Sequence, residues 1–341
     1  MLQVSIPYWR TQAPRPHTRA LTTSINGPTE LACDKAGFLF IVESMQQRLS
    51  RLNLRHDSIK VVLPQPENGF YQDFDYPNAV AADQKGNLFI ADFNGRLREL
   101  DRQSGEVKVL LGTSLDHSDR PFEVPAQMTV DGEGNVLVVD RHHKVFRWQK
   151  RSGELETVAG TGVPGFAGDG GLATNAKLAF PMGVAVDRNG DIFIADYRNC
   201  RIRKIDLKTQ IITTIAGTGE CASKGDGGPA IQASLNYPSS MTLDDAGNLF
   251  FVEGATDRAR RIDPHGVITT YAGTGQKGCG GDGGPATKAA LNNPAGVAVD
   301  SDGALYISEY VSNRIRRVDP VTHIITTVAG NGTPERVDVV L

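Results

Sequence analysis

The amino-acid sequence predicts an all-β protein, a six-bladed β-propeller whose blades are four-stranded antiparallel sheets. A seven-residue segment that begins with proline and ends with aspartate occurs six times in the 341 residues, and it places the blade starts near residues 28, 77, 125, 181, 238 and 294. An acidic residue follows each of these aspartates by nine positions, as Glu43, Asp92, Asp140, Asp196, Glu253 and Glu309. The intervals between the aspartates are 49, 48, 56, 57 and 56 residues, and a repeat of this length is typical of propellers and solenoids.

Each repeat contains four short runs that are typical of strands. In the fourth repeat they cover residues 183–187, 191–196, 201–206 and 211–217, and they are rich in β-branched residues and separated by turn residues. The first run is small and apolar, as expected of an innermost strand, whereas the third carries arginine and lysine, as expected of an outer strand. Four strands in each of six repeats favour a propeller over a solenoid.

The repeats divide the chain into a propeller over residues 28–330, an N-terminal extension over 1–27 and a C-terminal tail over 331–341. Residues 20–25 resemble an outermost strand, although the sixth repeat already has its own fourth strand at residues 324–329. The N-terminus therefore either adds a closing strand beside blade 6 or displaces the C-terminal strand. The sequence leaves both arrangements open.

Composition excludes several classes of protein. The net charge of −3 lacks the basic excess that nucleic-acid binding requires. The sequence has no apolar run of 18 residues and no signal-like N-terminus, so we expect a soluble, cytoplasmic protein without a membrane segment. Cys33 lies in an apolar run, and Cys221 and Cys279 lie in glycine-rich loops without metal-ligand spacing. We expect free thiols, as in a reducing compartment.

The linkers and strands of the later repeats resemble NHL repeats. The resemblance is carried by AGTGVPGFAGDGGLATNAKLAFPMGVAVD (159–187) and AGTGQKGCGGDGGPATKAALNNPAGVAVD (272–300), followed by RIRK- or RIRR-type third strands. It is strong over residues 125–330 and weaker in blades 1 and 2. It implies a propeller that serves as a binding platform or sensor, or a relative of six-bladed hydrolases and lyases, and it indicates fold better than function.

The repeated charges are expected to be structural, because six copies of one acid suit a scaffold better than a catalytic group. We expect each acid to bind the arginine or lysine four or five residues later, and thus to fix the turn between strands two and three. Three GDGG runs lack the lysine of a phosphate-binding loop. Their aspartates, Asp169, Asp226 and Asp282, are expected to bond local backbone amides in glycine turns.

Departures from the repeat mark the candidate site, because propellers bind ligands at loops and at the channel mouth. Just after the blade prolines, Glu30, Asn78, Gln127 and Ser240 supply polar side chains where the innermost strands begin. A lone carboxylate in a funnel is a candidate general base or metal ligand. The alternative is a water-filled channel lined by soluble residues.

The turns after strand two supply further candidates. His142 is a candidate acid or base beside Glu30, and Tyr197 and Tyr310 put aromatic surface around the same face. If a divalent metal such as Ca²⁺ or Zn²⁺ binds the channel, Glu30, Asn78 and Gln127 are its expected ligands. No cofactor is required by the sequence, and no triad of histidines occupies equivalent blade positions.

Two functions remain open from the sequence. The first is a platform that binds a small molecule, peptide or protein on its top face, with Asn78, Gln127, Ser240, Tyr197 and Tyr310 as contacts. The second is a lyase or hydrolase at the channel mouth, with Glu30 and His142 as catalytic groups. The irregular linkers of blades 1 to 3 favour a site on that side of the mouth.

Overall fold

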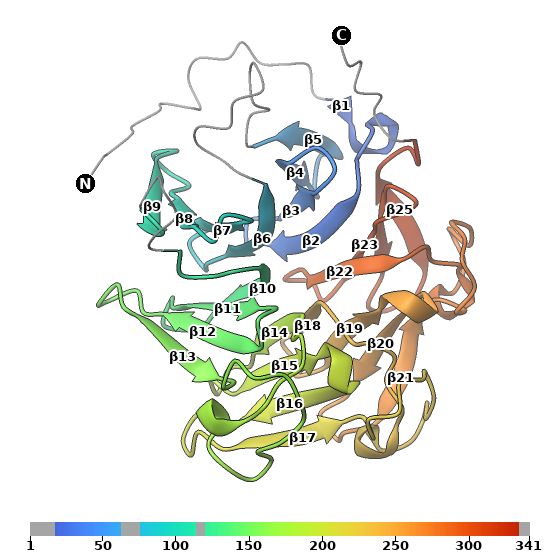
Figure 1. Ribbon diagram of the computed structural model, residues 1–341. Helices are drawn as coiled ribbons and strands as arrows, with labels where there is room; N and C mark the ends of the chain where they lie inside the picture. Colours follow the sequence, from blue (N-terminus) through green and yellow to red (C-terminus); the bar gives the residue numbers. More distant parts are fainter. Residues whose placement is uncertain (1–17, 63–75, 114–119, 334–341) are drawn as a thin grey trace, which may run out of the picture.

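The computed structural model describes residues 18–62, 76–113 and 120–333, and it shows six antiparallel sheets arranged around a centre (Figure 1). This confirms the predicted six-bladed propeller. Blades 1 to 3 consist, from the inside outwards, of β2 (Pro28–Cys33), β3 (Phe38–Glu43), β4 (Arg48–Asn53) and β5 (Ser58–Val61); β6 (Pro77–Ala82), β7 (Leu88–Asp92), β8 (Leu97–Leu100) and β9 (Val107–Leu111); and β10 (Pro125–Val130), β11 (Val136–Asp140), β12 (Lys144–Trp148) and β13 (Leu155–Ala159).

The later blades follow the same order. Blades 4 to 6 consist of β14 (Gly183–Val186), β15 (Ile192–Asp196), β16 (Arg201–Ile205) and β17 (Ile212–Ala216); β18 (Met241–Leu243), β19 (Leu249–Glu253), β20 (Arg258–Ile262) and β21 (Ile268–Ala272); and β22 (Pro294–Val299), β23 (Leu305–Glu309), β24 (Arg314–Val318) and β25 (Ile325–Ala329). The helices among the described residues are short 3₁₀ turns, and none has the length and apolar character needed to cross a membrane.

The aspartate that ends each repeated segment forms the turn between the first two strands of its blade. In blade 4, Asp187 Oδ1 accepts hydrogen bonds from the backbone N–H groups of Asn189 (2.8 Å) and Asp191 (2.9 Å). Gly190 takes a φ of +85° inside this turn, which suits glycine. The same two bonds form at Asp34, Asp83, Asp131, Asp244 and Asp300. Because the bonding is local, it recurs wherever the sequence pattern recurs.

The second repeated acid fastens the linker that enters its own blade. In blade 5, Glu253 Oε1 accepts the backbone N–H of Asn236 (2.9 Å), and its Oε2 lies 3.1 Å from Nη1 of the buried Arg260. Nη2 of Arg260 reaches Asp226 of the preceding GDGG run at 2.8 Å. Blades 4 and 6 repeat this cluster through Arg203 and Arg316.

These contacts correct two expectations from the sequence. In blades 4 to 6 the arginine that binds the acid lies in the middle of the third strand, seven residues after the acid, rather than four or five. In blade 1 the expected pair does form, since Arg48 Nη2 lies 2.8 Å from Glu43 Oε2. The GDGG aspartates bind these buried arginines rather than the expected local amides, because a buried guanidinium must be paired with an anion.

The hydrophobic core is divided among the interfaces between neighbouring blades. Each of six buried clusters joins two adjacent blades, including the pair formed by blade 6 and blade 1. Between blades 3 and 4, for example, Leu137 and Val139 share a cluster with Ile194 and Ile205. The ring is therefore held by aliphatic packing at every joint.

Among the described residues, no blade contains strands from both ends of the chain. β25 is the outermost strand of blade 6, and the N-terminal strand β1 (Thr18–Arg19) pairs with β5 of blade 1 (Figure 1). Residues 20–22, expected as part of a strand, form the 3₁₀ turn η1, whose Ala20 carbonyl accepts the N–H of Gly330 at 3.0 Å. The corresponding bonds in the linkers run from Gly160 to Ala173, from Gly217 to Ala230 and from Gly273 to Ala286. The N-terminal segment thus takes the place of a blade linker.

Candidate functional site

A narrow channel runs between the six innermost strands. Its cavity measures about 160 Å³ and is lined mainly by small and aliphatic residues, together with Gln127 and two threonines, at equivalent positions of the blades: residues 31–33, 80–82, 127–130, 184–186, 241–243 and 297–299. Register shifts interrupt four of these strands just after their prolines. A bulge of this kind redirects side chains. It places Glu30, between Pro28 and Leu31, at the end of the channel.

The amide of Gln127 crosses that end of the channel. Its Oε1 accepts the backbone N–H groups of Val184 (2.8 Å) and Met241 (3.1 Å). Its Nε2 donates to Ser240 Oγ (2.9 Å) and to the Met241 carbonyl (3.1 Å). Gln127 of blade 3 therefore links this blade to blades 4 and 5 by pairing backbone groups of their innermost strands.

Ser240 and Glu30 continue this network to the remaining side of the ring. Ser240 Oγ accepts the backbone N–H of Val297 (3.1 Å) and lies 3.4 Å from Glu30 Oε2, to which it donates. The exposed fractions are 7% for Glu30, 3% for Gln127 and 1% for Ser240. The structure thus brings together three of the residues predicted from sequence, as a buried polar plug that we call the channel plug (Glu30, Gln127 and Ser240).

The pKa of Glu30 is shifted by its surroundings in the channel plug. Burial away from water raises the pKa of Glu30 to about 8, against the opposing influence of its hydrogen bonds with Ser240 and Gln127 and of the Arg141 charge. Its carboxyl group is therefore mainly protonated at neutral pH. A buried carboxylic acid of this kind donates and accepts hydrogen bonds without carrying charge.

Arg141 lies at the channel mouth, close enough to Glu30 for their charges to interact. It occupies the position directly after the strand-two acid, where the other blades have Ser44, Phe93, Tyr197, Gly254 and Tyr310. Its side chain is half-buried, its Nε is buried without a hydrogen-bond partner, and it forms no ion pair within the described part of the chain. Sequence reasoning missed Arg141, although a comparison of this position across the six blades would have singled it out as the charged one.

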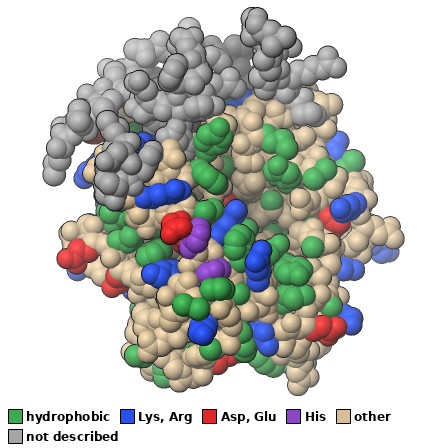
Figure 2. Space-filling model, in the orientation of Figure 1, with side chains coloured by type: hydrophobic (Ala, Val, Ile, Leu, Met, Phe, Trp, Pro, Cys, Tyr) green, Lys and Arg blue, Asp and Glu red, His purple; other side chains and the backbone are tan. Residues whose placement is uncertain are grey.

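An aromatic cluster stands beside Arg141. Phe180, Tyr197 and Tyr237 form a chain of ring contacts, with centroid separations of 6.1 Å and 5.1 Å. The guanidinium carbons of Arg141 and Arg198 lie 5.8 Å and 4.9 Å from the Phe180 ring centroid, a range in which cations are attracted to aromatic faces. Figure 2 shows hydrophobic, basic and histidine side chains gathered around the centre of this face. We call Arg141, Phe180, Tyr197, Arg198 and Tyr237 the mouth cluster.

The two adjacent histidines have different surroundings. His142 is exposed, with Nε2 3.1 Å from Glu123 Oε2 and Nδ1 3.4 Å from Asp140 Oδ1, so its imidazole contacts these acids rather than Glu30. His143 has a φ of +69°, and its Nδ1 accepts the backbone N–H of Phe180 at 3.0 Å. Burial, His142 and Arg198 lower the pKa of His143. His143 thus acts as a neutral structural acceptor.

The remaining predicted residues lie apart from the channel plug. Asn78 is half-buried in blade 2, and its Nδ2 donates to the Pro125 carbonyl of blade 3. Tyr310 is half-buried in the corresponding turn of blade 6, where its N–H donates to the Asn293 carbonyl at 3.1 Å.

The expected metal ligands do not fit a metal site. Asn78 is engaged with blade 3, and the Gln127 oxygen is already shared by two backbone amides. Over the described ranges, no three His, Cys, Asp or Glu side chains converge on one point. A hard cation needs several oxygen ligands together, so we derive no metal-dependent step.

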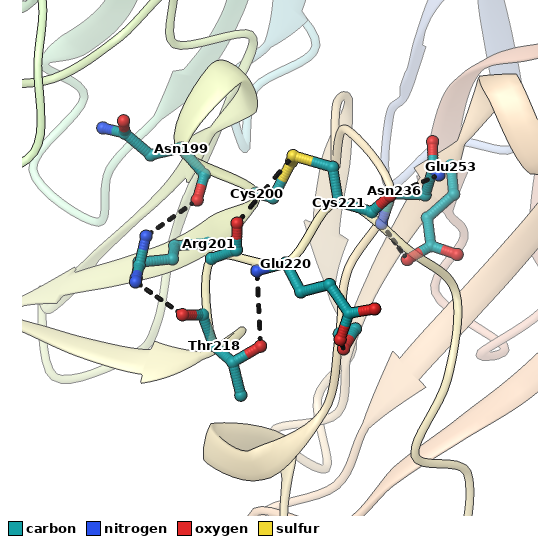
Figure 3. The surroundings of a disulfide bond; sticks show 10 residues. Asn199, Cys200, Arg201, Thr218, Glu220, Cys221, Asn236 and Glu253 are labelled. Atoms are coloured by element: carbon teal, nitrogen blue, oxygen red, sulfur yellow. Dashed lines mark hydrogen bonds between the residues drawn. A yellow bond between two sulfur atoms is a disulfide. The ribbon is translucent and has the colours of Figure 1, made fainter.

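A disulfide between Cys200 and Cys221 corrects the expectation of free thiols (Figure 3). Cys200 is buried in the turn between strands two and three of blade 4, and Cys221 lies in the linker to blade 5. Cys33 and Cys279 are free. Sequence reasoning failed because the pairing depends on the packing of a linker against a turn 21 residues away. Disulfides are typical of oxidising compartments, so the cysteines no longer support a reducing one.

Comparison with known proteins identifies the repeat type. The model of the teneurin NHL domain matches residues 76–224, 218–278 and 273–336. Teneurin-1 of Caenorhabditis elegans is 29% identical over 177 residues, which cover 44% of this chain and 6% of that protein. The chain therefore spans less than a tenth of this relative's length.

Two solved structures share the fold. A protein of unknown function from Bacteroides thetaiotaomicron superposes with a TM-score of 0.67 at 18% identity, covering 88% of this chain and 71% of the other. Virginiamycin B lyase from Staphylococcus aureus gives a TM-score of 0.55 at 16% identity, covering 93% and 87%. At these identities the likeness concerns the fold alone.

Proposed function

This chain belongs to the NHL-repeat family, as a member of the teneurin NHL domain type, and we propose that it is a binding platform whose ligand docks on the mouth cluster. NHL propellers serve as protein- or ligand-binding scaffolds, and the regular charge clusters of this ring make it a rigid one. The observation that carries the proposal is the contrast between the buried channel plug and the more exposed cluster of cations and aromatic rings beside it.

The chemistry of the mouth cluster suits binding. Tyrosine and arginine are enriched at the energetic centres of interfaces, because they combine large contact area with hydrogen-bonding groups. Tyr197 and Tyr237 are half-buried and Arg198 is exposed, so they are accessible to a ligand. The repeated acids and arginines, by contrast, are engaged with one another inside the blades.

Hydrogen–deuterium exchange tests where ligands dock. The full chain would be measured with and without fragments from a library of aromatic acids, amides and amines. We expect protection in residues 141–143, 197–199 and 237, and little change in the opposite turns at 188–190, 245–247 and 301–303. Replacing Tyr197 by alanine should abolish the protection, whereas Leu207→Ala, at an exposed site of an outer turn, should not. Protection confined to the opposite turns would refute the proposed docking face.

A second candidate function is favoured by one observation, the raised pKa of Glu30 near Arg141, since perturbed acids in clefts are common in active sites. In this alternative the protein is a lyase or hydrolase in which Glu30 exchanges a proton with the substrate and His142 assists. Turnover of ester and lactone probes by wild type, Glu30→Gln and His142→Asn tests it. Equal rates in all three proteins would rule out this alternative.

A further inference from the structure

We infer that the mouth cluster takes an anionic ligand: a carboxylate that pairs with Arg141, carried on an aromatic or apolar body that lies against Phe180, Tyr197 and Tyr237. This inference rests on the proposed function and specifies the chemical class of its ligand. The same chemistry is offered by a free aromatic acid and by an acidic side chain next to an aromatic residue in a protein partner.

The first argument is the state of Arg141 compared with the other buried arginines. Arg203, Arg260 and Arg316 each contact two carboxylates, one in their own blade and one in the preceding linker. Arg141 is half-buried and, unlike those three, contacts no carboxylate within 4 Å among the described residues. A half-buried guanidinium without an ion pair favours the binding of a carboxylate, to which it can donate two parallel hydrogen bonds.

The second argument concerns the acids around Arg141. Glu30 is mainly neutral at pH 7, because burial raises the pKa of Glu30 to about 8. Asp140 accepts the backbone N–H groups of Glu123 (2.7 Å), Val124 (3.3 Å) and His142 (2.8 Å), and Glu123 faces His142. Asp140 therefore attracts Arg141 through its charge without a direct ion pair, and the guanidinium remains free to bind a further carboxylate.

The third argument is the surface on which the rest of the ligand would lie. The exposed Arg198 shares the Phe180 ring with Arg141, and it adds a second cation on the rim. The rings of Phe180, Tyr197 and Tyr237 continue away from this pair of cations. The surface is therefore cationic at the two arginines and aromatic next to them. This arrangement matches a ligand with an acidic end and an apolar body.

Three probes of nearly identical shape test the charge preference: 4-phenylbutyrate, its neutral amide and 4-phenylbutylamine. Their dissociation constants for the full chain at pH 7 would be measured by calorimetry, and the site would be located by exchange protection. We expect the carboxylate to bind at least about tenfold more tightly than the amide, since hydrogen bonds to a charged group are stronger than those to a neutral one. The amine should bind most weakly.

Arg141→Gln is the decisive variant, and Arg188→Gln is its control because Arg188 is exposed in a turn at the opposite end of blade 4, where it pairs with Asp245. Arg141→Gln should remove the advantage of the carboxylate over the amide, whereas Arg188→Gln should leave it unchanged. Thermal unfolding checks that both variants are folded. Should Arg141→Gln fail to fold, Arg141→Lys serves instead, and it should reduce the preference because lysine lacks the planar fork.

The outcomes separate the inference from the proposed function. Equal binding of carboxylate and amide with protection at the mouth cluster would overturn the anionic class while leaving the docking face intact. A carboxylate preference that survives Arg141→Gln would also overturn it. Protection confined to the opposite face would overturn both. Repeating the measurement with the capped peptides Phe-Glu and Phe-Gln distinguishes the sources, since a preference limited to the peptide assigns the carboxylate to a protein partner.

Discussion

His143 of blade 3 accepts, at Nδ1, a hydrogen bond of 3.0 Å from the backbone N–H of Phe180, the residue that precedes the first proline of blade 4. Blade 5 makes the equivalent bond from Asn293 N–H to Asp257 Oδ1 (2.8 Å), and blade 6 makes it from Gly27 N–H to Asn313 Oδ1 (2.9 Å). Each acceptor residue has a positive φ near +50° to +70°. In these three blades one side chain of the turn thus fastens the blade to the next, and in blade 4 Cys200, which forms the disulfide, stands at this position.

This joint predicts a dependence of stability on pH. Because burial lowers the pKa of His143 below 6.5, the folded state prefers the neutral imidazole. The stabilisation is complete above pH 6.5 and declines as the pH falls through that value towards the folded-state pKa, because the unfolded chain binds the proton first. His143→Asn should keep the acceptor and flatten this part of the profile, whereas the exposed control His265→Asn should not. Urea unfolding between pH 5 and 7.5 measures the difference in the pH dependence of stability.

The disulfide predicts the number of free thiols. Denatured but unreduced protein should titrate two thiols, Cys33 and Cys279, and reduced protein should titrate four. Cys221→Ser should lower the free energy of unfolding by about 3 kcal/mol, because the bond closes a loop of about 21 residues in the unfolded chain. Cys279→Ser is the control and should change little, since Cys279 is free and exposed. Four titratable thiols in the unreduced protein would contradict the bond.

The channel plug predicts that Gln127 stabilises the ring. Gln127→Ala leaves the N–H groups of Val184 and Met241 without their acceptor, and we expect a loss of about 2 kcal/mol, with water entering the channel as partial compensation. Gln103→Ala, on an exposed turn of blade 2, should change the stability little. Chemical denaturation of both variants provides the measurement, and equal midpoints would show that the channel plug contributes nothing.

The raised pKa of Glu30 leads us to expect a second effect of pH on stability, opposite in direction to that of His143. Because burial raises the pKa of Glu30 from 4.5 to about 8, the unfolded chain loses its proton first as the pH rises. The folded state is therefore progressively disfavoured between about pH 4.5 and 8. Glu30→Gln removes this term, so its stability relative to wild type should increase across that interval. A constant difference between the two proteins from pH 5 to 8 would show that Glu30 is ionised in the fold.

The repeat could be predicted from sequence because the interactions behind it are local. Asp187 binds amides two and four residues later, so its spacing from the proline and from the next acid is preserved in every blade. The position of Glu30, Gln127 and Ser240 at the start of innermost strands followed from the same alignment. Their mutual bonds could not be predicted, because Glu30 and Ser240 are 210 residues apart in sequence.

What the sequence determined by itself was therefore the number of blades, the order of strands within each and the ring of candidate residues at one end. Only the tertiary structure decided which of those residues meet, that Arg141 is left unpaired among the described acids, that Cys200 pairs with Cys221, and that the N-terminus closes the ring as a linker. The physical reason is distance along the chain. Hairpins, turns and caps form between neighbours, whereas these contacts depend on how six separately built blades rotate and pack against one another.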